Sequence, residues 1–337
     1  MPGNPRRTTL ATVAASAGVS VTTVSKVLNG RRDVAPGTRS LVQSLLLEHG
    51  YVPRSARREH AESPGTVQLW VDELCAYSTE IIKGAIEAGA ESGVAVVVGP
   101  TKDTAGSGVT WAHDLAAGGC RALITLTSEP ASAQLAALSR VRLPVVVIDP
   151  LNLPDTPVTS VGATNFAGGL SATRHLLALG HRRIAYLGGP ATTAINQARM
   201  HGFRAAMEAA GVPVPAEYIR NVGFCYPHGL QEGAALLDLD PAPTAIFAAG
   251  EESALGAIQA ARARGLRIPE DLSVVGFDDT ELAVMTSPPL TTVRQPLRQM
   301  GTVALRTALR LAAGEKIESR HIELATELVV RGSTLAA

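Results

Sequence analysis

The sequence predicts an α/β protein in which a small all-α domain precedes two lobes, each built on a doubly wound parallel sheet. Two observations predict this architecture. From Thr66 onward, short apolar segments alternate with amphipathic helical segments in two successive series. Only 4% of the 337 residues are aromatic whereas 46% are hydrophobic, so the cores are expected to consist mainly of Val, Leu, Ile and Ala.

The N-terminal segment predicts three short helices. Thr8 or Thr9 can cap the first helix, which ends at Gly18, and Ser20 caps a second helix over residues 21–28. A third helix is expected from about residue 36 to residue 50. The apolar positions of the first two helices follow helical spacing: Leu10, Val13, Ala14 and Ala17, then Val24, Val27 and Leu28. Two helices joined by a glycine turn predict a helix-turn-helix unit.

The two lobes are predicted from buried strands that alternate with helices. The first series has strands at 66–71, 94–99, 122–127 and 144–149, with helices at 78–93 and 131–141 between them. The segment TSVGATN leads into the second series. Its strands lie at 182–189, 245–250 and 272–279, and its helices at 166–180, 198–211 and 251–265. Two such series place a cleft at the carboxyl ends of the strands.

The charge is distributed unevenly along a chain whose total charge is zero. Residues 1–60 hold nine Lys and Arg against three Asp and Glu, so this segment carries +6 and the remainder −6. A basic, folded N-terminal domain on an acidic body indicates a polyanionic partner such as DNA.

The remaining composition excludes several classes of protein. No apolar run approaches the ~20 residues that cross a bilayer, and MPGNPRRTTLATV lacks the apolar core of a secretory signal. Cys75, Cys120 and Cys225 are too widely spaced for a disulfide framework or a metal cluster. We therefore expect a cytoplasmic, nucleoid-associated protein with no membrane partner, no metal and no cofactor.

The second helix of the helix-turn-helix unit carries the predicted DNA contacts. Its outward residues suit base edges in the major groove, with Lys26 as a candidate donor to guanine. The predicted base contacts are Val21, Thr22, Ser25 and Lys26, and the predicted phosphate contacts are Thr23, Asn29, Thr38 and Arg39. Thr9 and Ser20, at the helix starts, complete the predicted DNA-binding set. The alternative is a helical hairpin whose polar face is merely solvated.

The segment LATVAASAGVSVTTVSKVLNGRRDVAPGTRSLVQSLLLEHGYVP resembles the N-terminal domain of the LacI/GalR family of transcriptional regulators. The match covers VA-x-x-AGVS-x-x-TVS-x-VLN, V-x-x-x-TR and GY-x-P. It implies that Val21, Thr22 and Lys26 are the main base readers. It also implies a homodimer on a near-palindromic double-stranded operator, with half-sites about one helical turn apart.

The family usually continues with a hinge helix whose leucine wedges into the minor groove. Here the segment reads RSARREHAESPG, and His60 stands where that leucine would fall. Ala56, Arg57 and Arg58 are predicted to lie in the minor groove, where arginine is attracted to the negative potential. Either the operator is bent less, or its centre is read through arginine.

The segments GHRRIAYLGGP, PTAIFAAGEESALG and SPPLTTVRQP resemble the effector-binding core of the same family, a fold shared with periplasmic sugar-binding proteins. The resemblance implies a DNA-binding domain over 1–53, a hinge over 54–65 and an effector-binding core over 66–337. Within that core it implies a first lobe of about 66–162 and 294–315, a second lobe of about 163–293, and a C-terminal segment near the lobe junction.

Three polar residues sit where a cleft between parallel lobes needs them, namely Asp149, Arg199 and Asp278. Carboxylates and a guanidinium give the donor and acceptor arrangement that holds sugar diols. The resemblance implies effector contacts at Arg199 and Asp278, and it supports Asp149.

Other positions complete the predicted effector site. The resemblance places an aromatic wall at Phe224, and Tyr77 and Phe166 could complete an aromatic cage. Gly250-Glu251 stands where many family members carry Asn-Asp, so a hydroxyl-binding amide is missing at Gly250.

The predicted function is a sequence-specific transcriptional repressor whose operator binding is modulated by a sugar bound between the lobes. A purine or nucleobase corepressor is an alternative within the same class. Alternatives of another class are a sugar-binding or sugar-modifying α/β protein. The chain lacks G-x-G-x-x-G, P-loop, G-x-S-x-G and H-E-x-x-H patterns, so we do not expect an enzyme.

Overall fold

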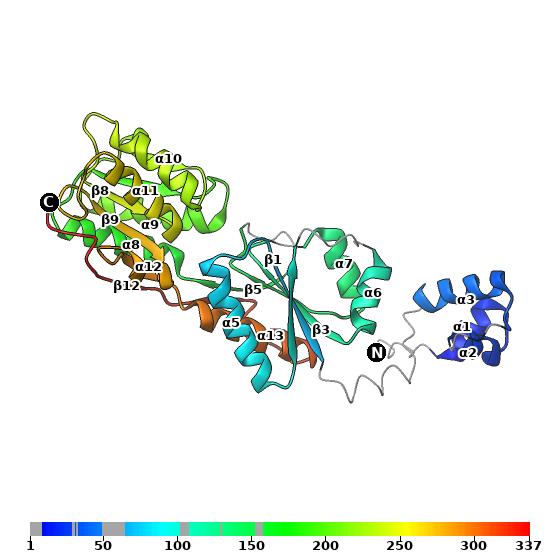
Figure 1. Cartoon of the computed structure of the whole chain (residues 1–337). Coiled ribbons are helices and arrows are strands. Elements are labelled where there is room, and N and C mark those ends of the chain that lie inside the picture. The colour runs from blue at the N-terminus through cyan, green and yellow to red at the C-terminus, as the bar shows by residue number, and fades with distance from the viewer. Residues whose placement is uncertain are drawn as a thin grey trace.

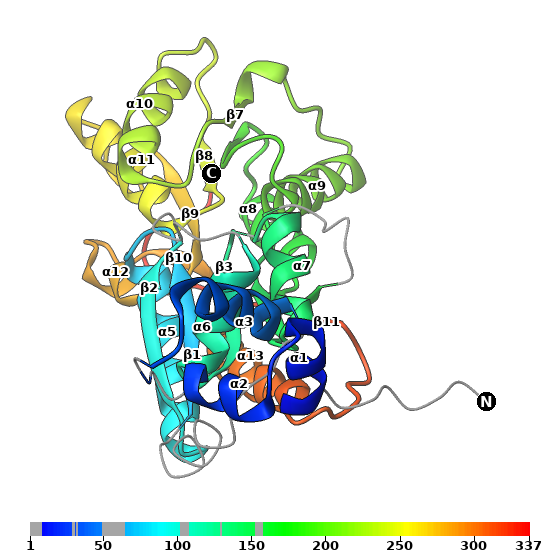
Figure 2. The same ribbon diagram turned by 90° about the vertical axis from the view of Figure 1, so that its right-hand side faces the viewer.

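The structure is a computed structural model that describes residues 9–28, 31, 33–48, 65–101, 108–128, 130–151 and 158–337. The described residues form three parts arranged along one long axis, with the first α/β lobe between a small helical domain and the second α/β lobe (Figure 1). Figure 2, viewed from the side of the helical domain, shows its helices in front of the first lobe.

The helical domain contains α1 (Leu10–Ala17), α2 (Val21–Leu28) and α3 (Pro36–Glu48). Thr9 caps α1 by accepting the amide of Thr12, and Gly18 ends the helix with φ +65°, a conformation that glycine adopts without strain. Ser20 caps α2 by accepting the amide of Thr23 at 3.1 Å. The small core of this domain consists of Val13, Ala14, Val24, Val27, Val42 and Leu46. The three helices and their predicted apolar faces are confirmed.

The first lobe is built on a six-stranded, all-parallel sheet in the order β11-β5-β4-β3-β1-β2. Its strands are β1 (Thr66–Val71), β2 (Ala95–Pro100), β3 (Cys120–Leu126), β4 (Val145–Ile148), β5 (Thr159–Ala163) and β11 (His321–Leu324). Its helices are α5 (Ala76–Glu91), α6 (Val109–Ala117), α7 (Ser132–Arg140) and α13 (Leu297–Ala312).

The second lobe has a six-stranded sheet in the order β12-β10-β9-β8-β6-β7, in which β12 alone runs antiparallel to its neighbour. Its strands are β6 (Ile184–Gly188), β7 (Ile219–Asn221), β8 (Ala245–Ala248), β9 (Ser273–Asp278), β10 (Thr291–Arg294) and β12 (Glu327–Val329). Its helices are α8 (Asn165–Ala178), α9 (Ala194–Ala209), the short η1 (Ala216–Tyr218), α10 (Tyr226–Leu237), α11 (Glu251–Ala263) and α12 (Glu281–Met285).

The chain passes between the lobes three times, after β5, after β10 and after β11. At the junction Thr164 donates its amide to the carbonyl of Leu324, and Thr326 donates its amide to the hydroxyl of Thr164, both at 2.9 Å. The first lobe therefore takes in β11 as well as α13. The C-terminal segment crosses the junction instead of ending there, because residues 331–337 lie along the second lobe, where Ala337 donates its amide to Leu179.

Close helix contacts without intervening side chains fix the position of α9. Gly169 on α8 lies directly against the backbone of Arg199 on α9, so a Cβ at Gly169 would overlap the Arg199 carbonyl. Gly84 on α5 meets the carbonyl of Arg298 on α13 in the same way in the first lobe. The Gly169 contact therefore holds the α9 backbone close against α8.

No single described helix is long and apolar enough to span a membrane. Only α1 and α2 together reach the required length and composition, and they are bent by 105° at the turn that joins them.

Candidate functional site

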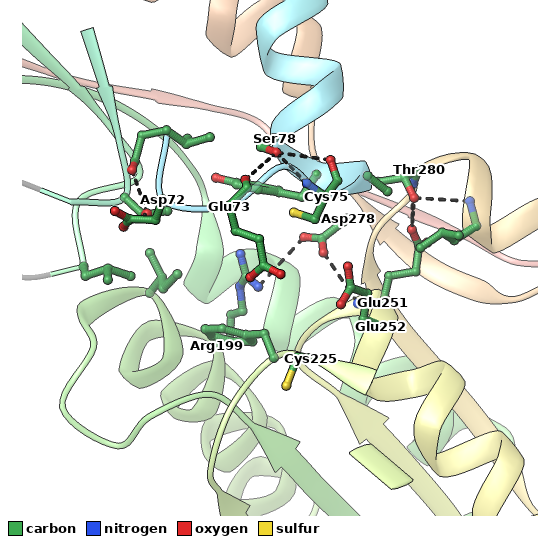
Figure 3. Close-up of a pocket in the computed structure, with 18 residues that line it drawn as sticks. Asp72, Glu73, Cys75, Ser78, Arg199, Cys225, Glu251, Glu252, Asp278 and Thr280 are labelled. Atoms are coloured by element: carbon green, nitrogen blue, oxygen red, sulfur yellow. Dashed lines mark hydrogen bonds and ion pairs between the residues drawn. The ribbon is translucent and has the colours of Figure 1, made fainter. Parts of the chain in front are cut away.

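A cavity of about 280 Å³ opens between the two lobes at the carboxyl ends of their strands. The first lobe contributes mainly the loop after β1 and the start of α5, residues 72–78. The second lobe contributes α9, the start of α11 and the segment after β9 (Figure 3). The predicted cleft is therefore present, and its walls come from strand ends in both lobes.

Arg199, on α9, is held in place before any ligand arrives. Its Nε donates to Oδ1 of Asn165 at 2.7 Å, and its Nη1 donates to the carbonyl of Ala249 at 2.6 Å. The guanidinium carbon lies 3.8 Å from the ring centroid of Phe277. Among the described residues Nη2 has no hydrogen-bond partner, so this nitrogen is available to a ligand.

Asp278, at the end of β9, faces this guanidinium (Figure 3). Its Oδ1 accepts a hydrogen bond from Nε2 of Gln295 at 2.6 Å and lies 4.0 Å from Nη1 of Arg199. The backbone at Asp278 has φ +122°, a conformation that non-glycine residues adopt at strain. Burial raises the pKa of Asp278 to about 6, so the carboxyl is largely ionised at neutral pH.

Asp149 contacts Tyr77 and does not line the cavity. The Tyr77 hydroxyl donates to Oδ2 of Asp149 at 2.6 Å, and Tyr77 itself lines the cavity. Asp149 is fully buried, and its Oδ1 has no hydrogen-bond partner among the residues that the structure describes. Burial raises the pKa of both the Asp149 carboxyl and the Tyr77 hydroxyl.

The remaining predicted effector residues divide into one that lines the cavity and two that do not. Phe224 lines it, with its ring centroid 5.6 Å from the Arg199 guanidinium carbon. Gly250 lies behind that ring, because a Cβ at Gly250 would stand 3.2 Å from Phe224 Cδ1. Phe166 on α8 is 47% exposed and is not a lining residue. Four predicted effector residues thus meet at the cavity, namely Tyr77, Arg199, Phe224 and Asp278.

Glu251 is a cavity residue that sequence reasoning did not assign to the site. Its side chain is buried at the start of α11, and its Oε2 accepts the amide of Thr280 at 3.0 Å and the Thr280 hydroxyl. Its Oε1 is buried and has no hydrogen-bond partner among the described residues. Burial, followed by the charge of Asp278, raises the pKa of Glu251 to about 8, so its neutral form predominates at pH 7. The available signal was its position three residues after β8, at the start of the next helix.

Three further acids in the lining were also missed. Asp72 and Glu73 follow β1 in the first lobe, and Glu252 stands beside Glu251 in the second (Figure 3). Burial, followed by the charge of Glu73, raises the pKa of Glu252. Asp72 and Glu73 lie at a strand end, where the same argument had placed Asp149 and Asp278, and Glu252 lies in the first turn of the helix that follows β8. The described residues contain no group of three or more His, Cys, Asp and Glu arranged to hold a metal ion.

The helical domain presents a second candidate surface on α2. Val21, Thr22 and Lys26 are exposed, while Thr23 and Ser25 are half-buried. Lys26 Nζ lies 2.7 Å from Oδ2 of Asp33, and both side chains face solvent.

Two predicted phosphate contacts lie on α3. Thr38 and Arg39 are both half-buried at the start of this helix, and Arg39 donates to the Arg31 carbonyl. The predicted contacts Asn29, Ala56, Arg57 and Arg58, together with the hinge, lie outside the described residues.

Comparisons with known proteins agree with this architecture. Residues 9–54 match the model of bacterial regulatory proteins of the lacI family, and residues 173–334 match the periplasmic binding protein-like domain. The chain is 36% identical to the HTH-type transcriptional regulator DegA of Bacillus subtilis, over 97% of this chain and 98% of DegA. The chain belongs to the LacI family.

Other LacI-family members share the whole length of the chain. The HTH-type transcriptional regulator CelR of Thermobifida fusca is 36% identical over 97% of this chain and 98% of CelR. Among solved structures, a CelR–cellobiose complex matches with a TM-score of 0.72 and 33% identity, covering 97% of this chain and all of that one. A lac repressor dimer bound to operator and the anti-inducer ONPF matches with a TM-score of 0.70 and 30% identity, covering 98% and 100%.

Proposed function

We propose that this LacI-family protein is a transcriptional repressor whose operator binding is controlled by a small hydroxylated ligand, in the first place a sugar, held between the lobes. The observation that carries this proposal is the preorganised Arg199 guanidinium facing the Asp278 carboxylate inside the interlobe cavity. A guanidinium donor beside a carboxylate acceptor complements the vicinal hydroxyls of a sugar.

The cavity walls support the same ligand class. Phe224 and Tyr77 supply flat apolar surfaces that suit the C–H face of a sugar ring. The volume of about 280 Å³ lies near the lower end of small-molecule sites, ~300 Å³, which favours a ligand of roughly mono- or disaccharide size. The solved CelR structure contains cellobiose, which is consistent with this assignment.

The control mechanism follows from which elements the ligand touches. A ligand in the cavity contacts both lobes, so its binding favours one relative orientation of the lobes over others. The helical domain connects to the first lobe only, and we propose that two chains pair so that this orientation sets the spacing of two α2 helices on DNA. In this proposal the protein binds DNA at the nucleoid, in the cytoplasm. It does not act as an enzyme.

The residue assignments form part of the proposal. We assign Val21, Thr22 and Lys26 to base edges, and Tyr77, Arg199, Phe224 and Asp278 to direct ligand contact. We propose that Asp149 and Gly250 act from behind the cavity, by holding Tyr77 and by leaving room for Phe224.

The test combines two measurements on the full chain. Selection from random DNA followed by a mobility-shift assay should yield a near-palindromic site bound at physiological salt, and failure to select any site would overturn the repressor assignment. A thermal-shift screen of sugars and nucleobases should then raise the melting temperature with a sugar. A response to nucleobases alone would replace the sugar with a purine-type corepressor.

A further inference from the structure

The interlobe cavity is strongly acidic. Within the described part of the chain, its lining contains one cationic side chain, that of Arg199, and two of its nitrogens already donate to protein acceptors. The lining contains five carboxyl groups, those of Asp72, Glu73, Glu251, Glu252 and Asp278. Of these, only Asp278 lies within 4.0 Å of a cationic group among the described residues. Even with Glu251 neutral, four carboxylates face one guanidinium.

Two of these carboxylates oppose each other from different lobes. Glu73 belongs to the loop after β1 in the first lobe, and Glu252 belongs to the first turn of α11 in the second. They lie close enough for the charge of Glu73 to raise the pKa of Glu252. Bringing the lobes together around a neutral ligand would increase this repulsion and remove water from both groups, which is unfavourable. A positive charge between them would reverse the sign of that interaction.

Glu251 supplies a separate observation that points to a ligand. Glu251 is only 2% exposed and lines the cavity, and within the described part of the chain its buried Oε1 has no hydrogen-bond partner. A buried polar atom without a partner is unfavourable in a native structure, because no hydrogen bond offsets its loss of solvation. A ligand group that hydrogen-bonds Oε1 would remove this penalty.

We propose that the ligand of this cavity carries a protonated amine on a hydroxylated frame, as an amino sugar or amino polyol does. The amine lies between Glu73 and Glu252 with Glu251 beside it, while the hydroxyls bind Arg199 and Asp278. The inference rests on the proposed function, since it specifies which hydroxylated ligand the same cavity takes. A neutral sugar would satisfy Arg199 and Asp278 but leave the other carboxylates desolvated and unpaired.

The test uses matched ligands that differ only at one substituent. Three sets of ligands are compared at about pH 7. Glucosamine is compared with glucose and N-acetylglucosamine, and galactosamine is compared with galactose and N-acetylgalactosamine. The third set compares 1-amino-1-deoxysorbitol with sorbitol. Thermal shift ranks each set, and calorimetry measures the responders. We expect an amine member to bind at least tenfold more tightly than its hydroxyl and N-acetyl partners. We also expect this margin to shrink as salt rises.

Variants connect the amine preference to the two opposed acids. Glu73→Gln combined with Glu252→Gln should bring the affinities of the amine and hydroxyl members within about twofold of each other. The matched control is Glu318→Gln with Glu208→Gln, which removes one exposed carboxylate from each lobe outside the cavity and should preserve the preference.

The outcomes separate this inference from the proposed function. If no amine member exceeds its hydroxyl partner, the inference is overturned, whether or not a neutral sugar binds. A neutral sugar that binds through Arg199 would in that case leave the proposed function standing. An amine preference that persists in the Glu73→Gln/Glu252→Gln variant would also overturn the inference, because the charge recognised would then lie elsewhere.

Discussion

Nη1 of Arg199 lies 4.0 Å from Oδ1 of Asp278, and neither group depends on the other for a hydrogen bond. The guanidinium donates to Asn165 and Ala249, and the carboxylate accepts from Gln295. The two charged groups are therefore fixed separately, and no described residue is a hydrogen-bond partner of Arg199 Nη2. A hydroxylated ligand can accept from the guanidinium and donate to the carboxylate without first breaking a hydrogen bond between these two groups, so little reorganisation opposes binding.

The first prediction concerns Arg199→Lys. Lysine keeps the positive charge but lacks the planar fork that reaches Asn165, Ala249 and the ligand together. Ligand affinity should fall at least tenfold, about 1.4 kcal/mol or more, whereas operator affinity without ligand should stay within about twofold. Calorimetry and mobility shift on the same preparations give the two values.

Arg204→Lys is the matched control, because Arg204 is an exposed residue on the same helix. It should leave both affinities unchanged. Equal ligand affinity in Arg199→Lys and Arg204→Lys would remove Arg199 from the site.

Sequence reasoning placed Arg199 and Asp278 at the cavity because residues after parallel strands, and helices beside them, converge on one edge of each sheet. It could not assign Asp149 to a supporting role, because that role depends on complete burial beside Tyr77, a residue 72 positions away. Phe166 is an aromatic near a strand end like Phe224, and only the packing of α8 shows that it faces away from the lining.

The protonation state of Glu251 likewise could not be predicted from the sequence. A glutamate after a strand is visible in the sequence, but its protonation state depends on burial and on the charge of Asp278, a distant residue along the chain. The acidity of the cavity likewise arises from loops of two lobes that meet only in the folded chain. The fold class and helix positions, in contrast, follow from local periodicity, which the sequence carries directly.

The second prediction concerns pH and Glu251. Its pKa rises from 4.5 to about 8 on folding, so between these values the folded chain binds more protons than the unfolded chain. The free energy of unfolding should therefore fall as pH rises through about 5 to 8. Glu251→Gln mimics the neutral acid and retains an acceptor for Thr280, so it should remove this slope and raise the melting temperature most at pH 8.

Melting temperatures of both proteins across this pH range provide the measurement. Other groups titrate in the same window, including Asp278 with a pKa of about 6, so the difference between the two curves is the informative quantity. A difference that stays constant with pH would contradict the raised pKa of Glu251.

The third prediction concerns Lys26 and Asp33 in the helical domain. Their 2.7 Å ion pair is exposed and screened by solvent, so it is weak and DNA can displace Asp33 easily. Asp33→Asn should raise DNA affinity severalfold and steepen its salt dependence, because it removes a negative charge that competes with phosphates. Lys26→Ala should reduce discrimination between the operator and altered sites by about 1–3 kcal/mol.

Fluorescence anisotropy over a salt series, with operator and random duplexes, measures both effects. Asp271→Asn breaks an exposed ion pair of the same length in the second lobe and serves as the control for Asp33→Asn. Lys316→Ala replaces an exposed lysine outside the helical domain and serves as the control for Lys26→Ala. Unaltered selectivity in Lys26→Ala would show that this residue contacts phosphates and not bases.

The fourth prediction tests whether the close packing of α9 against α8 positions Arg199 for the ligand. A methyl group at Gly169 would overlap the backbone carbonyl of Arg199, so Gly169→Ala should push α9 away from α8 and displace the guanidinium. We expect a loss of stability of about 1–3 kcal/mol together with a loss of ligand affinity of at least tenfold. Thermal unfolding and calorimetry measure the two effects.

Gly84→Ala separates the two effects, because its methyl group would overlap the carbonyl of Arg298 on α13, which contributes no lining residue, and Gly84 itself lies about two helical turns along α5 from the lining residue Tyr77. It should reduce stability by a similar amount while most of the ligand affinity remains. If both variants lost affinity equally, general loosening of the lobes would explain the effect. A selective loss in Gly169→Ala would instead show that the backbone contact between α8 and α9 holds Arg199 at the position that the ligand requires.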